Sequence, residues 1–167
     1  MFGVYFPYQE MHMSEITLKE ISLENLRDVS KLTETLTLDQ QQCVAPNAFS
    51  IAEGLLTGAD AWFKAVCLGE TPIGFVMVHT GTDDWDPDEY PGVYLWRFMI
   101  AGPYQHKGYG TQVLDMLVSK FREEERKVMY TSCVMGSSSP YDFYISYGFT
   151  DTLEQEEGEQ VLKLILQ

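Results

Sequence analysis

The stretch from residue 93 to residue 126 most constrains how this chain can fold. It begins with VYLWRFMI, a nearly all-apolar run typical of a central strand that is buried on both faces. A glycine-rich join, YQHKGYG, leads from this strand into a segment whose apolar residues recur at helical spacing. Those apolar residues are Val113, Leu114, Leu117, Val118 and Phe121. The stretch therefore predicts a buried strand, a tight loop and an amphipathic helix that packs on the sheet.

The segments on either side predict an α/β (α+β) fold, with a mixed, mostly antiparallel central sheet flanked by helices. Ser22 is expected to cap a helix that runs to about Leu36, and the capping box SIAE at Ser50 is expected to start a second. PYDFYISYG predicts a short helix between Pro140 and Gly148. Further strands are expected at 15–22, 61–68, 72–80, 127–135 and 160–167, with a hairpin turn at GETP.

The pattern suggests one domain over residues 14–167, preceded by an N-terminal extension over residues 1–13. No linker, repeat or low-complexity segment divides the longer range. Met11 and Met13 are alternative starts, and the first residues lack the positive charge of a signal peptide. No apolar run reaches the roughly 18 residues that a membrane helix needs. We expect a cytoplasmic protein that does not bind membranes.

The net charge of −14 argues against nucleic acid as a partner, because nucleic acid requires a basic face. An acidic chain suits cationic small molecules better, although surplus acid can also serve solubility alone. The three cysteines, Cys43, Cys67 and Cys133, are odd in number and scattered. They predict reduced thiols, with no disulfide framework, zinc site or other metal site.

The glycine-rich join can hold an anion or can be a simple turn. The start of the following helix offers unpaired backbone N–H groups and the positive end of a dipole. Gly108 and Gly110 would let a phosphate approach the backbone, and Lys107 adds a positive charge. Neither the P-loop string nor the third glycine of the dinucleotide fingerprint is present. The string Gln105-His106-Lys107-Gly108-Tyr109-Gly110 fits a third phosphate-binding pattern, [Q/R]-x-x-G-x-[G/A].

This string resembles the acetyl-CoA pyrophosphate loop of the GCN5-related N-acetyltransferase (GNAT) family. LWRFMI is similar to that family's fourth strand, and SSSPYDFYISYGF is similar to a later helix with Phe143-Tyr144 and Gly148-Phe149. The resemblance extends from about Glu15 to the end of the chain. Within the family, LWRFMI, YQHKGYG and VMGSSSPYDFY look most like bacterial diamine (spermine/spermidine) N-acetyltransferases.

The resemblance implies direct transfer of an acetyl group from acetyl-CoA, as cosubstrate, to a primary amine of a small cationic acceptor such as a polyamine. Tyr144 matches the family's general acid, although spacing alone would make it a core tyrosine. The matching cofactor positions are Phe98, Met99 and Ile100 for the pantetheine, Gln105, His106, Lys107, Gly108, Tyr109, Gly110 and Thr111 for the pyrophosphate, and Ser137, Ser139 and Tyr147 for further CoA contacts. Ser137 and Ser139 stand where many relatives have an asparagine.

The acceptor side is less defined by the sequence. Asp83, Asp84, Trp85 and Asp86 form an acidic loop that either binds a polycation or is a solvated turn. A second acidic run, 154–159, is expected to be a solvated hairpin turn. Trp96 stands where polyamine enzymes of this family carry an acidic residue, so no general base is assigned. Either an acid of the 83–89 loop acts through water, or the free amine is drawn from the deprotonated fraction.

Two other functions stay open on the sequence. The chain could acetylate another amine, such as an aminoglycoside, an amino acid or a protein N-terminus. It could instead be a catalytically weak module that binds acetyl-CoA. By analogy with the family, a homodimer is expected.

Overall fold

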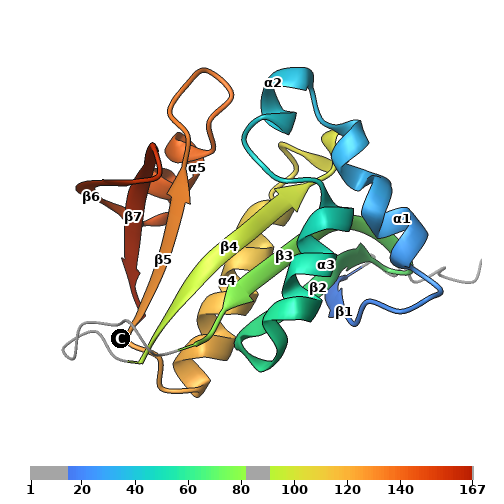
Figure 1. The fold of residues 1–167 in the computed structure, drawn as a ribbon, viewed down its shortest axis with the longest axis horizontal. Coiled ribbons are helices and arrows are strands. Elements are labelled where there is room, and N and C mark those ends of the chain that lie inside the picture. Colours follow the sequence, from blue (N-terminus) through green and yellow to red (C-terminus); the bar gives the residue numbers. More distant parts are fainter. Residues whose placement is uncertain (1–14, 82–90, 167) are drawn as a thin grey trace, which may run out of the picture.

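A computed structural model describes residues 15–81 and 91–166 of the chain. They form a seven-stranded sheet with helices on both faces (Figure 1). The strands are β1 (Ile16–Lys19), β2 (Ala61–Leu68), β3 (Thr71–His79), β4 (Gly92–Ile100), β5 (Val128–Cys133), β6 (Thr150–Glu156) and β7 (Glu159–Ile165). The helices are α1 (Leu26–Lys31), α2 (Leu38–Gln41), α3 (Asn47–Thr57), α4 (Tyr109–Glu123) and α5 (Tyr141–Tyr147).

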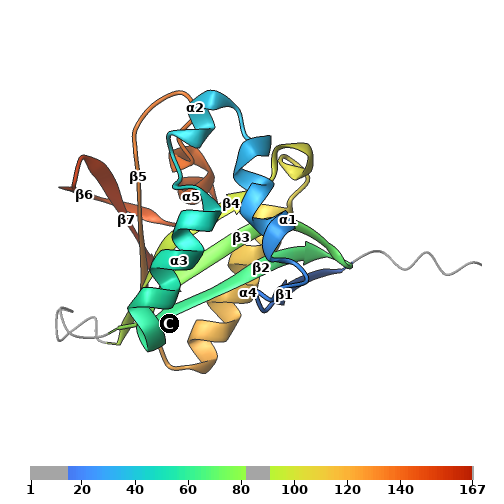
Figure 2. The same cartoon turned by 45° about the vertical axis from the view of Figure 1, so that its right-hand side comes forward.

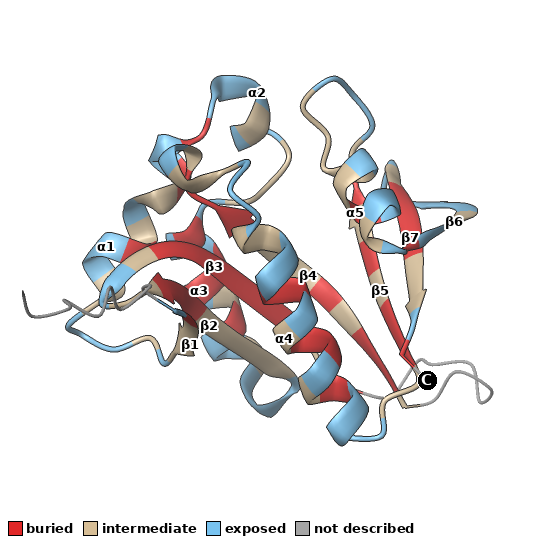
Figure 3. Ribbon diagram, turned by 180° about the vertical axis from the view of Figure 1, so that it is seen from behind, coloured by how far each residue is buried: buried red, intermediate tan, exposed pale blue. Residues whose placement is uncertain are grey.

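The sheet has the order β1-β2-β3-β4-β5-β7-β6. Every neighbouring pair is antiparallel except β4 and β5, which are parallel. The prediction of a mixed, mostly antiparallel sheet with flanking helices is therefore confirmed. The sequence interpretation missed β6, whose sequence TDTLEQE is polar because this strand lies exposed at the sheet edge (Figure 3).

The helices form one layer on each face of the sheet (Figures 1 and 2). The apolar face of α4, with Leu114, Leu117 and Phe121, packs into one core cluster, and Tyr144 of α5 belongs to the same cluster. Val29 of α1 and Ile51 of α3 pack into a second cluster on the opposite face. The predicted amphipathic helix after the glycine-rich join is confirmed, with all its expected apolar residues buried.

The first helices differ from their predicted bounds. A helix begins at Leu26 rather than near Ser22, and it tightens into a 3₁₀ turn after Lys31. The next long helix begins at Asn47 and not at Ser50, which is buried inside it. The Ser50 hydroxyl donates to the Pro46 carbonyl at 3.3 Å, so it cannot cap a helix start. Pro46 precedes the first helical residue, and its fixed φ suits a helix start better than the serine pattern does.

Strands β4 and β5 separate soon after they meet. They pair only at Gly92–Val128, Val93–Met129 and Tyr94–Tyr130, and then diverge (Figure 1). Past Tyr94, β4 has no strand partner on its β5 side within the described residues. The prediction that β4 is buried on both faces is therefore wrong for its middle, where Tyr94 and three later residues are half-buried. No helix of the described residues is long and apolar enough to cross a bilayer.

The residues predicted as an N-terminal extension, 1–13, lie outside the described residues. The acidic loop with Asp83, Asp84, Trp85 and Asp86 also lies outside them.

Candidate active site

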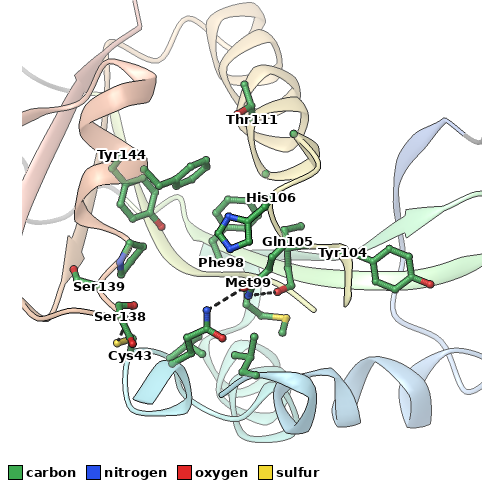
Figure 4. Close-up of a pocket in the computed structure, with 18 residues that line it drawn as sticks. Cys43, Phe98, Met99, Tyr104, Gln105, His106, Thr111, Ser138, Ser139 and Tyr144 are labelled. Atoms are coloured by element: carbon green, nitrogen blue, oxygen red, sulfur yellow. Dashed lines mark hydrogen bonds between the residues drawn. The ribbon is translucent and has the colours of Figure 1, made fainter. Parts of the chain in front are cut away.

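A pocket of about 570 Å³ lies where β4 and β5 diverge (Figure 4). One side is formed by Phe98, Met99 and Ile100 at the end of β4, and the opposite side by the start of α5. The loop into α4 and the segment around α2 complete the wall. The remaining lining residues are Leu36, Gln40, Cys43, Val44, Tyr104, Gln105, His106, Gly108, Gly110, Thr111, Ser138, Ser139, Pro140, Phe143 and Tyr144.

The strand side of the pocket can pair with an extended ligand. Phe98, Met99 and Ile100 lie on the part of β4 that pairs with β3 but has left β5. Backbone N–H and C=O groups on the free side of such a strand can bind an extended chain by hydrogen bonds, as another strand would. The three residues predicted to lie along a pantetheine arm are thus brought together at an open strand edge.

The start of α4 offers backbone N–H groups to an anion. The first helical hydrogen bond of α4 runs from the Gln112 N–H to the Gly108 carbonyl at 3.1 Å. The N–H groups of Tyr109, Gly110 and Thr111 precede that bond, so they have no acceptor within the helix. Together with the helix dipole they form an anion-binding end. Gly108, Gly110 and Thr111 line the pocket at this end.

The two glycines of the join serve different purposes. Gly108 has φ +81°, a left-handed conformation that favours glycine, and no described atom lies within 4 Å of a Cβ built on it. Gly110 has an ordinary φ, but a Cβ there would lie 3.2 Å from Cζ of Phe143. The structure thus gives Gly110 a packing reason against α5, in addition to the close approach of a ligand that the sequence suggested.

Gln105 ties the glycine-rich loop to two other elements. Its side-chain amide donates to the Ile100 carbonyl at 2.9 Å and accepts a hydrogen bond from Nε2 of Gln40, also at 2.9 Å (Figure 4). His106 lines the same part of the pocket with φ +59°. Lys107 does not line it, because its ammonium group lies over the Tyr104 ring, 5.5 Å from the ring centre. Tyr109 also packs near Tyr104, with 6.5 Å between the ring centres.

Tyr144 lies in the pocket wall and is 4% exposed. Its ring packs between Phe143 and Phe149, with ring centres 5.4 and 5.3 Å away. Burial raises the pKa of Tyr144 well above its ordinary value, and the hydrogen bond with Thr131 only partly opposes this. The phenol is therefore protonated at neutral pH, which is the state that a proton donor needs.

Of the other predicted CoA contacts on this side, one lines the pocket and two do not. Ser139 lines the pocket, and its hydroxyl accepts a hydrogen bond from the Tyr141 N–H at 3.1 Å. Ser137 is exposed and does not belong to the pocket lining, where its neighbour Ser138 takes part instead. The Tyr147 hydroxyl donates to Asp115 of α4 at 2.9 Å, away from the lining residues.

The segment around α2 was not predicted to contribute. It supplies Gln40, Cys43 and Val44 to the lining, and the Cys43 thiol donates to the Ser138 carbonyl at 3.7 Å across the pocket. The sequence does carry a signal for this helix, because Thr37 and Gln40 form a reciprocal capping box. Burial raises the pKa of the Cys43 thiol, and the nearby charges of Asp39 and Glu159 raise it further.

Trp96, at the position of the expected acid, packs with the core cluster under α1 and α3. It stands at a bulge of β4 opposite Met77 and Val78. Its ring lies 5.2 Å from the Arg97 guanidinium, and Nη2 of Arg97 is 3.2 Å from the Glu53 carboxylate. The Glu53 carboxylate, which lies beside Arg97, is therefore paired with a cation. Within residues 15–81 and 91–166, no three histidine, cysteine, aspartate or glutamate side chains group as metal ligands.

Comparisons with known proteins show the family and the fold of the chain. Residues 27–149 match the sequence profile of the acetyltransferase (GNAT) family. A search of curated proteins gives no match. PaiA N-acetyltransferase from Thermoplasma acidophilum, solved with coenzyme A, is 14% identical with a TM-score of 0.66, covering 90% of this chain and 99% of its own.

Two further solved structures share the fold. The ribosomal-protein-S18-alanine N-acetyltransferase of Escherichia coli is 12% identical with a TM-score of 0.67, covering 92% of this chain and 95% of its own. A GNAT family acetyltransferase from Elizabethkingia anophelis with acetyl-CoA bound is 16% identical with a TM-score of 0.63, covering 90% and 97%. At these identities the likeness concerns the fold.

Proposed function

Because the chain belongs to the acetyltransferase (GNAT) family and is an acetyl-CoA-dependent N-acetyltransferase, we propose that its acceptor is a small cationic amine such as a polyamine. The observation that carries this proposal is the charge around the pocket. No lysine, arginine, aspartate or glutamate of the described residues lines the pocket, so the charge comes from residues just outside its lining. The carboxylates of Asp39, Glu156 and Glu159 lie close enough to raise the pKa of Cys43 or Tyr94. A primary ammonium group would be attracted to this side.

The proposed position of acetyl-CoA follows from the two halves of the pocket wall. The pantetheine arm pairs with the open edge of β4 at Phe98, Met99 and Ile100, and the pyrophosphate lies at the start of α4. In a chain of net charge −14, backbone N–H groups are a means of holding a polyanion without adding cationic side chains. Holding the thioester in a fixed orientation next to the acceptor supplies much of the rate gain, because the two reactants no longer have to meet by diffusion.

The chemistry proceeds by direct transfer. The neutral amine nitrogen attacks the thioester carbonyl carbon, the carbon–sulfur bond breaks, and the thiolate leaves. Tyr144 donates its hydroxyl proton to the departing sulfur, and the proton that the nitrogen loses on forming the amide returns to the Tyr144 oxygen. The raised pKa of Tyr144 keeps this proton available at neutral pH.

An acceptor screen tests this proposal. Release of the CoA thiol is measured with acetyl-CoA and spermidine, putrescine, butylamine, an aminoglycoside and a peptide with a free N-terminus. We expect turnover with spermidine and putrescine to exceed that with butylamine, which has the length of putrescine but one amine. We also expect the KM for spermidine to rise with salt, because salt screens the attraction between charges.

Three outcomes would contradict the proposed acceptor. A preference for butylamine over putrescine would remove the role of the second positive charge. Turnover with the peptide alone would assign the enzyme to protein N-termini. Tight binding of acetyl-CoA with no turnover of any amine would indicate a binding module.

A further inference from the structure

Three side chains form a row of hydrogen bonds across the sheet where β4 and β5 separate. Tyr94 is the last β4 residue paired with β5, and its hydroxyl donates to Oγ of Ser132 in β5 at 2.7 Å. The Ser132 hydroxyl in turn donates to the carboxylate of Glu159 in β7. All three residues are half-buried. The row therefore links Tyr94, at the point where β4 and β5 separate, to a carboxylate that lies two strands away in the sheet.

The predicted solvated hairpin turn within 154–159 is confirmed at its exposed tip, but the prediction is wrong for Glu159. The turn itself lies at Glu157 and Gly158, where both residues have positive φ and are exposed. Glu159 is the first residue of β7 and lies half-buried against Ser132. One end of the row thus lies at the point where β4 and β5 separate, and the other lies beside an exposed turn from which a proton can reach solvent.

The row lies on the face of the sheet opposite α4 and α5. In β4, Val93 and Leu95 on either side of Tyr94 pack with the α4 cluster, so Tyr94 points the other way. In β5, Met129 and Cys133 also belong to that cluster, which places Ser132 on the same open face as Tyr94. On this face α1 and α3 lie over β2 and β3, and no described helix covers β5 and β7 (Figure 1). An acceptor can approach the pocket from this face.

We propose that Tyr94 accepts the proton of the acceptor ammonium group and passes a proton through Ser132 to the Glu159 carboxylate. The proposal rests on the proposed function, since it requires an amine acceptor. This relay would act as the general base in place of the acidic residue that is absent at position 96. Its three groups come from three different strands. Glu53 is not an alternative, because its carboxylate is paired with Arg97.

The transfer balances in protons and charge. The ammonium nitrogen gives one proton to the Tyr94 oxygen while the Tyr94 hydroxyl proton moves to Ser132. The Ser132 hydroxyl proton moves to Glu159 at the same time. Tyr94 and Ser132 end as they began, the amine is neutral, and Glu159 is a carboxylic acid that later releases its proton to water. The neutral amine then attacks the thioester.

The charged groups near Tyr94 favour proton transfer through a neutral hydroxyl over a permanently deprotonated phenolate. Burial raises the pKa of Tyr94, the Ser132 hydrogen bond lowers it, the charges of Glu156 and Glu159 raise it, and that of Arg97 lowers it. The net pKa lies above the ordinary value, so the hydroxyl keeps its proton at neutral pH and can only exchange one proton for another. The Glu159 carboxylate also raises the pKa of Tyr144, which places this end of the row near the proposed proton donor.

The test compares Glu159→Gln and Tyr94→Phe with wild type over pH 6 to 10, using the best amine of the acceptor screen. Glu157→Gln is the matched control, because it removes a carboxylate from the exposed turn beside Glu159 and leaves the row intact. We expect both row variants to lower kcat about 10- to 100-fold at pH 7, which is at or below the low end of general-base effects. The deficit should shrink as pH rises, because more acceptor is then already neutral. The Kd for acetyl-CoA and the control variant's activity should stay unchanged.

Several results would overturn the relay. A loss of kcat that is equal at every pH, or a weaker Kd for acetyl-CoA, would indicate a structural role. A higher KM with unchanged kcat would make Glu159 an acceptor-binding group. If Tyr94→Phe unfolds, Ser132→Ala breaks the same row, and full activity of that variant would exclude it. If the wild type is active and the variants are equally active, only the relay is refuted. If the wild type is inactive with every amine, the proposed function is refuted as well.

Discussion

The proposed cofactor side of the pocket is made mostly of backbone groups, whereas the proposed acceptor side is made of side chains from three strands. On the cofactor side, the open edge of β4 and the N–H groups at the start of α4 lie within one continuous stretch, 98–111. On the acceptor side, Tyr94, Ser132 and Glu159 come from β4, β5 and β7. We therefore expect the first side to tolerate many different side chains and the second to depend on each of its three polar side chains.

This difference reflects how much each of the two ligands varies from one acetyltransferase to another. Every acetyltransferase of this kind holds the same cosubstrate, and a phosphate can be bound by N–H groups and a dipole alone. Acceptors differ in charge and length, so they are distinguished by particular side chains. Substitutions on the cofactor side should therefore act through backbone conformation. Substitutions on the acceptor side should act through the loss of a polar group.

The largest expected effect is that of Tyr144→Phe, which removes the hydroxyl where the two sides meet. We expect kcat to fall about 100-fold, within the range for a lost general acid. The Kd for acetyl-CoA should stay unchanged, because the ring keeps its packing against Phe143 and Phe149. Steady-state kinetics and calorimetric titration measure the two quantities.

The matched control for this change is Tyr147→Phe, on the same helix. Its hydroxyl bonds Asp115 and lies outside the pocket lining, so we expect normal kcat and Kd. A weaker Kd in Tyr147→Phe would restore its predicted CoA contact. An unchanged kcat in Tyr144→Phe, with chemistry shown to limit the rate, would leave Tyr144 as a core tyrosine.

The sequence predicted the strand, the glycine-rich join and the helix around the proposed cofactor side well, because their signals are local. An apolar strand, two glycines and a helical stripe follow one another, and the loop string between them is specific. The acceptor side could not be predicted in the same way. Ser132 and Glu159 are ordinary polar residues until the sheet order places β7 beside β5. The strand β6 was missed for a related reason, since an exposed edge strand has no apolar alternation to reveal it.

A tenfold effect on the cofactor side is expected from Gly108→Val. The residue has φ +81°, and a β-branched side chain in that conformation costs about 1–2 kcal/mol, which corresponds to roughly a tenfold weaker Kd for acetyl-CoA. No described atom lies within 4 Å of the added Cβ, so the fold should persist, as circular dichroism would check.

Gly58→Val is the control for backbone strain alone. Gly58 has φ +75°, an equally open Cβ position, and a place at the end of α3 outside the pocket lining. It should lower the Tm without changing the Kd for acetyl-CoA. Equal Kd changes in the two variants would mean that general destabilisation, and not the shape of the loop, weakens binding.

A smaller effect is expected from Gln40→Ala, which tests whether the α2 segment supports the cofactor loop. The change removes the hydrogen bond to Gln105, which then keeps only its bond to the Ile100 carbonyl. One partly buried hydrogen bond is worth about 1 kcal/mol, so the Kd for acetyl-CoA should weaken about 3- to 5-fold. Gln42→Ala, at an exposed neighbouring position, should leave it unchanged. A change in acceptor KM alone would place Gln40 on the acceptor side instead.

The smallest expected effect is that of Asp151→Asn, at the start of the hairpin that carries Glu159. The Leu153 N–H, at 2.7 Å, lowers the pKa of Asp151 most, and the Tyr141 hydroxyl at 2.8 Å lowers it further. A lowered pKa means that the charged form stabilises the fold at neutral pH and that this contribution disappears as pH falls below about 4. We expect a Tm about 2 °C below wild type at pH 7 and a difference that shrinks as the pH falls below about 4, measured by thermal melts. If acceptor KM rises while the Kd for acetyl-CoA holds, the hairpin belongs to the acceptor side alone. If both change, the cofactor side and the acceptor side are energetically coupled through β7 and do not act independently.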